Sequence, residues 1–96
     1  MERTESVELM NLCMIRRGSK VLVQDRKSKT WPGVAFPGGH VEKGEAFTDS
    51  VIREVQEETG LRIFSPRLCG VKDWCEDGVR HIVLLYHAEQ FTGTLR

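Results

Sequence analysis

Short hydrophobic segments alternate with turn residues along the first part of the chain, and they predict strands. Residues 7–15 and 21–25 are two such segments, joined by a glycine-containing turn at 17–20, so together they predict a β-hairpin. A polar loop is expected over residues 26–33. The run Pro37-Gly38-Gly39 is expected to interrupt any regular element, and a short extended piece is expected at 40–42.

The second half of the chain gives stronger strand signals. Residues 61–64 and 68–74 are expected to be extended, and an Asp-Gly pair at 77–78 predicts the turn of a second hairpin. The segment that follows, 79–90, contains the most hydrophobic run of the chain. A continuous hydrophobic run is typical of a central strand that is covered on both faces.

One segment has a helical period instead. Between residues 47 and 59, methyl-bearing side chains recur at intervals of three and four, and Gly60 follows as a C-terminal stop. The predicted core-facing residues are Thr48, Val51, Ile52, Val55 and Thr59.

The order of strands, one helix and further strands predicts a single α/β (α+β) domain over residues 1–96, with a mixed sheet. A single helix covers one face of such a sheet, whereas the hydrophobic run at 79–90 requires cover on both. We therefore expect either that C-terminal elements are missing or that a second chain supplies the cover, as in a homodimer.

Composition and charge exclude several classes of protein. Charged residues make up 29% of the chain, and 14 basic residues balance 14 acidic ones. This balance argues against disorder and against bulk electrostatic binding of a nucleic-acid polymer. No run approaches the length of a membrane span and the polar N-terminus is no secretory signal, so we expect a cytoplasmic protein. The spacing of Cys13, Cys69 and Cys75 predicts neither a disulfide framework nor a zinc site.

The predicted helix carries the candidate chemistry. At about 100° per residue, Glu54, Glu57 and Glu58 share an arc of about 100° on the flank of the core-facing side. Like charges at these spacings repel each other, so such a cluster costs stability unless a cation neutralises it. Carboxylate oxygens are the ligands that Mg²⁺ and Mn²⁺ prefer. A solvated acidic face remains the simpler interpretation of these residues taken alone.

The residues around these acids favour a functional interpretation over a solvated acidic face. From Gly39 to Leu61 the sequence matches every fixed position of the pattern G-x5-E-x7-R-E-U-x-E-E-x-G-U, in which U is a bulky aliphatic residue. The fixed positions are Gly39, Glu45, Arg53, Glu54, Val55, Glu57, Glu58, Gly60 and Leu61. This pattern resembles the signature of the Nudix hydrolase family, and the flanking strands extend the resemblance over nearly the whole chain.

The resemblance implies a mixed sheet sandwiched between helices, with residues 39–61 forming a loop–helix–loop that binds Mg²⁺ or Mn²⁺. It implies that Glu54 and Glu58 are metal ligands and that Glu57 is a third ligand or the catalytic base. The carbonyl of Gly39 is implied as a further ligand. Glu45 and Arg53 are implied to orient the ligand helix, with Arg53 counted among the catalytic residues.

The implied reaction is hydrolysis of the pyrophosphate bond of a nucleoside diphosphate linked to another moiety. The compact sequence resembles the MutT-like branch, which suggests an oxidised nucleoside triphosphate such as 8-oxo-dGTP. ADP-ribose or a nucleotide sugar is the alternative substrate, and a non-catalytic nucleotide-binding fragment is the alternative outside the enzymes. The second major helix of the family and its downstream acid are expected to be absent.

Residues outside the signature are weaker candidates. His40 follows the glycines and is a candidate for contacting the substrate, and Arg26 is a candidate for holding distal phosphates, together with Arg16 and Lys29. Trp31 and Trp74 could stack on a base, but packing is the favoured interpretation for both. His81 and His87 share one face of the last long strand, and a structural role is favoured for them.

Overall fold

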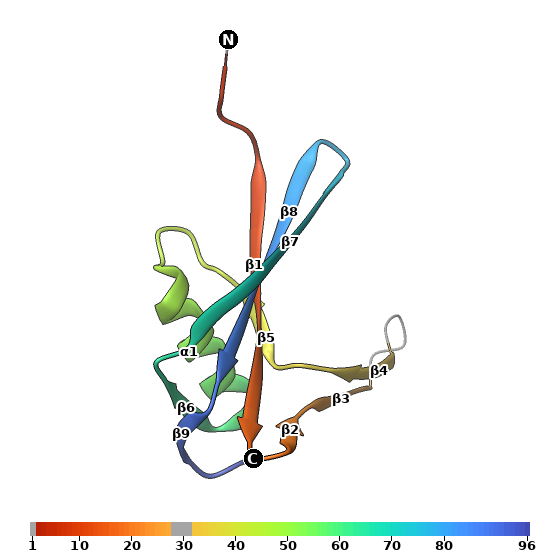
Figure 1. Cartoon of the computed structure of the whole chain (residues 1–96). Coiled ribbons are helices and arrows are strands. Elements are labelled where there is room, and N and C mark those ends of the chain that lie inside the picture. Colours follow the sequence, from red (N-terminus) through yellow and green to blue (C-terminus); the bar gives the residue numbers. More distant parts are fainter. Residues whose placement is uncertain (1, 28–31) are drawn as a thin grey trace.

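The computed structural model describes residues 2–27 and 32–96. The described chain forms nine strands and one helix, shown in Figure 1. The first five strands are β1 (Val7–Arg17), β2 (Lys20–Leu22), β3 (Gln24–Lys27), β4 (Pro32–Ala35) and β5 (Gly38–His40). The helix α1 (Phe47–Thr59) is followed by β6 (Leu61–Phe64), β7 (Arg67–Glu76), β8 (Val79–Ala88) and β9 (Gln90–Gly93).

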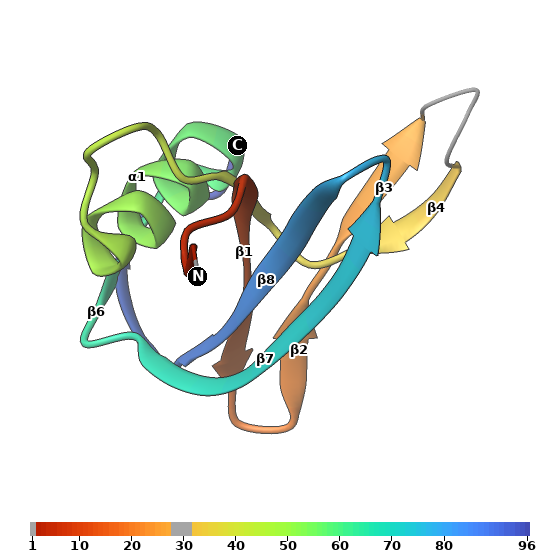
Figure 2. The same ribbon diagram turned by 90° about the horizontal axis from the view of Figure 1, so that it is seen from above.

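The main sheet is mixed, as the sequence predicts. Its order is β2-β1-β8-β7, with β5 pairing antiparallel to β1. The long strands β1 and β8 run parallel, whereas β7 and β8 form an antiparallel hairpin. Two smaller pairs, β3–β4 and β6–β9, complete the fold. Figure 2 shows α1 and the β3–β4 pair on opposite sides of the curved main sheet.

The core lies between α1 and one face of the main sheet. Its largest fully buried side chain, Ile63, comes from β6, and Val51 and Val55 come from α1. The sheet contributes Cys13, Ile15, Leu84, Tyr86 and Ala88. Alternate residues of β1 and β8 supply these positions because successive side chains of a strand point to opposite faces. The core therefore fixes α1 against the centre of the sheet.

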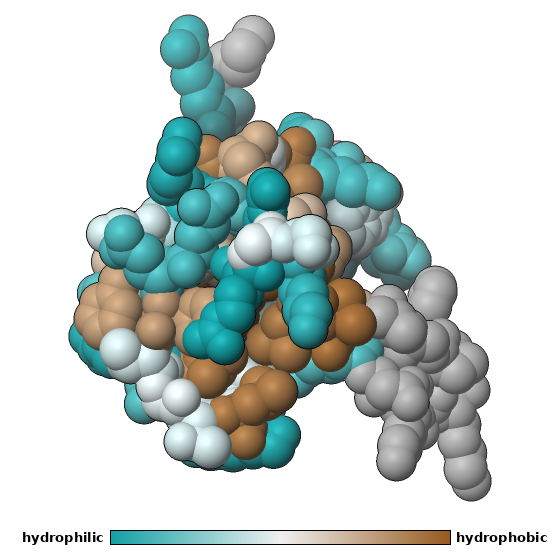
Figure 3. Space-filling view, turned by 60° about the horizontal axis from the view of Figure 1, so that its bottom comes forward, coloured by the Kyte–Doolittle hydropathy of each residue, from teal (hydrophilic) through white to brown (hydrophobic). Residues whose placement is uncertain are grey.

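The opposite face of β8 is less covered. Val83 and Leu85 stay half-buried, whereas Leu84 and Tyr86 on the helix side are buried. The prediction of cover on both faces is therefore met on one face only within the described residues. A further hydrophobic area surrounds a groove lined by Leu22, Leu61 and Phe91, among others, at the end of the molecule that Figure 3 brings forward.

Two predictions about the first half of the chain are wrong in detail. The segment 21–25 is broken at Val23 into β2 and β3, and β3 pairs with β4 across part of the predicted polar loop. The expected interruption at Pro37-Gly38-Gly39 is confined to Phe36 and Pro37 between β4 and β5, because Gly38 and Gly39 already belong to β5. Residue pattern alone missed this pairing, since the partner strand β1 lies far away in sequence.

The helix prediction is confirmed at both ends. α1 spans Phe47–Thr59, and Gly60 follows with φ 83°, a left-handed conformation that glycine adopts without strain. One core assignment is wrong: Thr48 is exposed and Ser50 is fully buried. Ser50 tolerates burial because its hydroxyl accepts a hydrogen bond from the buried Asn11 side chain at 2.9 Å.

No helix in the described part of the chain is long and hydrophobic enough to cross a bilayer.

Candidate active site

The strand β5 and the helix α1 are held together by one buried asparagine. The Asn11 Nδ2 donates to the Ser50 hydroxyl of α1 at 2.9 Å, and its Oδ1 accepts a hydrogen bond from the Gly39 N–H at 3.2 Å. Asn11 is 1% exposed, so both contacts lie out of water. This residue fixes the distance between the glycine strand and the helix that carries the acids.

The glycines bring the backbone of β5 directly against the acids of α1. The Gly38 N–H donates to Glu58 Oε2 at 3.1 Å. A Cβ at Gly39 would lie 2.8 Å from Glu54 Oε1 and nearer still to Oε2, so only a glycine leaves the Glu54 carboxylate where it is. The two glycines therefore let the backbone of β5 approach both carboxylates closely.

Glu54 and Glu58 line one cavity, which we call the glycine-strand cavity. Its volume is about 620 Å³, and Gly38, Gly39 and His40 line it together with Met10 of β1 and Trp74 of β7. The side chain of Glu54 is 14% exposed. The cavity thus combines two carboxylates and close backbone at one end with hydrophobic and aromatic side chains across the sheet.

Arg53 is the cation at the centre of the acidic residues. Its Nε and Nη2 donate to the two oxygens of Glu45 at 2.8 and 3.0 Å, and its Nη1 donates to Glu54 Oε1 at 2.9 Å. Nη2 also donates to the carbonyl of His40 at 3.1 Å. These contacts, Glu45 first, raise the pKa of Arg53 above its usual range. The guanidinium therefore ties the loop before α1 to the helix.

Glu45 completes this loop. Its Oε1 accepts a hydrogen bond from the Glu42 N–H at 3.0 Å, in addition to the two bonds from Arg53. The hydrogen bonds from Arg53, followed by that from Glu42, lower the pKa of Glu45 to about 2. The carboxylate is therefore held ionised as a positioning group.

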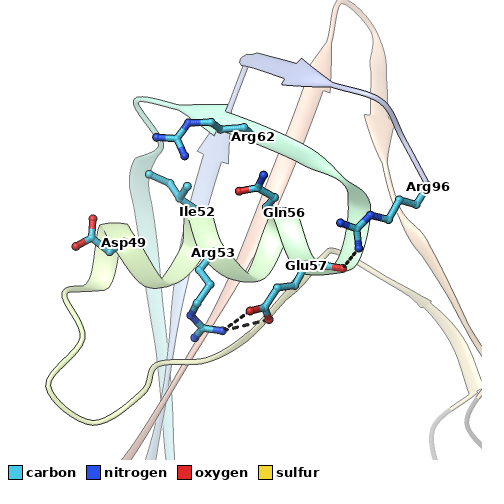
Figure 4. A pocket seen from close by; sticks show the side chains of 7 residues that line it. All are labelled: Asp49, Ile52, Arg53, Gln56, Glu57, Arg62 and Arg96. Carbon is cyan, nitrogen blue, oxygen red and sulfur yellow. Dashed lines mark hydrogen bonds and ion pairs between the residues drawn. The ribbon is translucent and has the colours of Figure 1, made fainter.

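Glu57 lies apart from the other two acids of the helix. Its carboxylate accepts hydrogen bonds from Arg53 Nη1 at 3.2 and 3.4 Å, and its side chain is 59% exposed. Figure 4 shows it at a second cavity on the outer flank of α1, with Arg62 and Arg96 nearby. We call this the helix-flank cavity. The single acidic arc expected from the helical period is thus divided between two cavities.

The acids differ in how well they could hold a divalent cation. Among the side chains that the structure describes, those of residues 2–24 and 35–96, no group of three or more His, Cys, Asp or Glu is arranged as metal ligands. The donor set nevertheless fits a hard cation, because Glu54 and Glu58 offer carboxylate oxygens in one cavity beside the backbone of Gly39. A ligand role for Glu57 would require its carboxylate to leave Arg53.

Of the weaker candidates, His40 lies at the glycine-strand cavity and Arg16 does not. His40 lines the glycine-strand cavity at its rim, where its imidazole is 61% exposed and its Nε2 lies 2.8 Å from Glu8 Oε1. Arg16 donates to the carbonyl of Gly18 and is not among the cavity residues. The side chain of Arg26 and the whole of Lys29 lie outside the described part of the structure.

Sequence reasoning missed two residues of the site. Asn11 could have been noticed as a polar amide at the centre of a hydrophobic strand, a position that asparagine disfavours unless its hydrogen bonds are met. Trp74 was assigned to packing, yet it is 39% exposed and lines the glycine-strand cavity. No signal in the local sequence around residue 74 indicated which cavity it would face.

Comparison with known proteins gives a consistent result. The family model of the NUDIX domain matches residues 10–96. The protein named "Uncharacterized Nudix hydrolase YvcI" of Bacillus subtilis is 40% identical over 86 residues, which cover 84% of this chain and 53% of that protein. An ADP-ribose pyrophosphatase of Methanocaldococcus jannaschii is 45% identical over 49 residues, covering 50% of this chain and 29% of that protein.

The fold of this chain is similar to that of solved structures. The crystal structure of a MutT NUDIX hydrolase from Burkholderia pseudomallei matches with a TM-score of 0.84 and 27% identity, covering 96% of this chain and 74% of that one. The chain spans about half the length of the Bacillus relative and less than a third of the archaeal one.

Proposed function

Because the chain belongs to the Nudix family, whose members hydrolyse phosphoric anhydrides and generally use divalent metal ions, we propose that it is a Mg²⁺-dependent nucleotide pyrophosphohydrolase. The observation that carries this proposal is the glycine-strand cavity, where Glu54 and Glu58 meet the backbone of β5. The proposed substrate is a nucleoside triphosphate, cleaved to monophosphate and pyrophosphate as expected for a MutT-like enzyme, with oxidised dGTP as the leading candidate.

The charges of the site explain why a cation is part of the proposal. A pyrophosphate and the carboxylates of Glu54 and Glu58 repel each other. When bound, Mg²⁺ would neutralise both and lower the pKa of an attacking water. Glu54 and Glu58 would hold the ion, and the Gly39 carbonyl belongs to β5, the strand that lies against these two carboxylates. Mn²⁺ has the same ligand preference and is the expected substitute.

The residues around the acids have separate tasks in this proposal. Arg53, fixed by Glu45, holds the Glu54 carboxylate against β5 through the 2.9 Å bond at Nη1. Glu57 is solvent-accessible and contacts the same guanidinium, which supports a role in accepting a proton from water. We propose that Glu57 is the general base or a third metal ligand.

A second substrate class has its own support. The archaeal relative named ADP-ribose pyrophosphatase is 45% identical over 49 residues, and its named substrate contains the same kind of diphosphate bond. Products separate the two possibilities: a triphosphate gives monophosphate and pyrophosphate, whereas ADP-ribose gives AMP and ribose 5-phosphate. We propose free nucleotides in the cytoplasm as the setting, and a homodimer remains a prediction.

The test is a panel of nucleoside triphosphates, oxidised dGTP and ADP-ribose incubated with the chain and Mg²⁺, with products identified by mass spectrometry. Glu57→Gln is expected to lower turnover by at least about 100-fold, the scale of a lost acid–base group. Glu76→Gln removes the same charge from exposed β7 and should leave turnover unchanged. Saturable nucleotide binding without any product would instead identify a non-catalytic nucleotide-binding protein.

A further inference from the structure

An aromatic pair stands on the sheet face opposite α1. Trp74 of β7 and His81 of β8 are register partners, and their rings stack with centroids 5.2 Å apart and planes 9° from parallel. The imidazole of His81 is 19% exposed, so it supports the indole from the sheet. Stacking on a neighbouring ring limits the rotamers of Trp74, which holds a large flat surface in a fixed orientation.

A carboxylate lies between this pair and the glycine strand. Glu8 of β1 places Oε1 2.8 Å from His40 Nε2 and Oε2 3.7 Å from His81 Nδ1. The same carboxylate therefore faces the strand that carries Gly39 and the ring that supports Trp74. None of Glu8, His81 and Trp74 belongs to the acidic signature, and the proposed hydrolysis does not use them.

Trp74 and the acids line one cavity. The glycine-strand cavity extends from Glu54 and Glu58 at β5 across Met10 and Val83 to Trp74 at the sheet edge. Strands β5 and β7 are separated by β1 and β8, which corresponds to about 14 Å along a flat sheet. A phosphate chain alone does not bridge that span, whereas a phosphate chain with a sugar and a planar base does.

Resting on the function proposed above, we propose that Trp74, backed by His81, is the platform on which the nucleobase of the substrate stacks. Trp74 is 39% exposed, and the hydrophobic residues Met10 and Val83 line the same cavity. Bases stack on aromatic side chains through their π faces with little dependence on identity. The substrate class is then a compound that carries a planar base at one end and its phosphates at the acids.

Intrinsic fluorescence tests this directly, because the chain has two tryptophans and a Trp31→Phe variant leaves Trp74 as the sole emitter. In the presence of Ca²⁺, a nucleoside triphosphate is expected to quench that emission saturably. Inorganic tripolyphosphate, which has no base, is expected to bind without quenching. Equal quenching by both ligands, or by neither at saturation, overturns the proposal.

Variants give a second measurement. Trp74→Leu should raise the Kd of the nucleoside triphosphate by about 10- to 100-fold and leave the Kd of tripolyphosphate unchanged. Trp74→Phe should restore most of the affinity. Val71→Ala, which alters an exposed residue of the same strand outside the cavity, should change neither. Circular dichroism checks that each variant is folded. If Trp74→Leu does not fold, the quenching measurement on Trp31→Phe carries the test.

The outcomes separate this inference from the proposed function. Base-dependent quenching without any hydrolysis refutes the enzymatic function and keeps the platform. If the chain hydrolyses nucleotides but Trp74→Leu changes the Kd of the nucleoside triphosphate and of tripolyphosphate equally, the function stands and the platform is refuted.

Discussion

Replacement of Gly39 by alanine separates the requirements of the site from those of the fold. An added Cβ would lie 2.8 Å from Glu54 Oε1 and nearer still to Oε2, whereas ordinary contacts of a Cβ begin near 3.4 Å. The atoms in its way belong to the end of a flexible side chain, so the carboxylate moves by about 1 Å and the backbone stays. That movement also lengthens the 2.9 Å bond from Arg53 Nη1.

The expected magnitudes differ for activity and stability. A misplacement of about 1 Å at a reacting group costs about 100-fold in rate. The folded state loses part of one charge-assisted hydrogen bond, which corresponds to about 1 kcal/mol at a site screened by solvent. Gly39→Ala should therefore fold cooperatively, with a denaturation midpoint close to wild type, and hydrolyse its substrate about 100-fold more slowly.

Two glycine variants serve as controls. A Cβ at Gly38 would lie 2.8 Å from the backbone of Asn11 and Leu12, which cannot move without opening the sheet, so Gly38→Ala should lose stability as well as activity. A Cβ at Gly70 meets only Leu85 Cδ1 at 3.4 Å, so Gly70→Ala should keep both. Urea denaturation and kcat/KM are measured on all three variants. Wild-type kcat/KM in folded Gly39→Ala would refute the reasoning.

Three further predictions follow from other contacts. Asn11→Leu leaves its two hydrogen-bond partners unsatisfied and should cost about 1–3 kcal/mol of unfolding free energy, measured by urea denaturation; an unchanged midpoint contradicts it. Folding lowers the pKa of Glu45 from 4.5 to about 2, so its stabilisation is present above about pH 4.5 and is lost as pH falls toward 2; Glu45→Gln should flatten the acid limb of stability against pH. Burial raises the pKa of Cys13 to about 12, so iodoacetamide at pH 8 should modify the two exposed cysteines and spare Cys13, as mass spectrometry would show.

Local pattern predicted the elements whose boundaries depend on nearby residues. The bounds of α1 follow from the spacing of Val51 and Val55 and from the stop at Gly60, all of which act within a few residues of each other. The Asp77-Gly78 turn is of the same kind, since both residues have positive φ and join β7 to β8. In each case the short-range preference and the final structure agree.

The parts of the fold that the sequence pattern did not predict depend on long-range strand pairing. Gly38 and Gly39 form a strand only because β1 offers a partner register that places Asn11 opposite Gly39. The same pairing buries Ser50, because the Asn11 amide reaches its hydroxyl, and it leaves Thr48 exposed at the start of the helix. These positions depend on a contact across 39 residues of chain, which no local periodicity contains.

The division of the acidic arc has an electrostatic cause. The sequence predicts that neighbouring glutamates on a helix need a cation, and Arg53 of the same helix supplies one by contacting Glu54 and Glu57 from a single nitrogen. This contact relieves the repulsion within the chain itself, while Glu57 lines the helix-flank cavity and Glu58 bonds to Gly38. A helical projection gives the angle of each carboxylate but not its partner, so the sequence predicted which acids form the cluster and missed that Arg53 contacts Glu54 and Glu57. Under the proposed function, a divalent cation held by Glu54 and Glu58 would compete with Arg53 for the Glu57 carboxylate, and that competition would decide between the two roles proposed for Glu57.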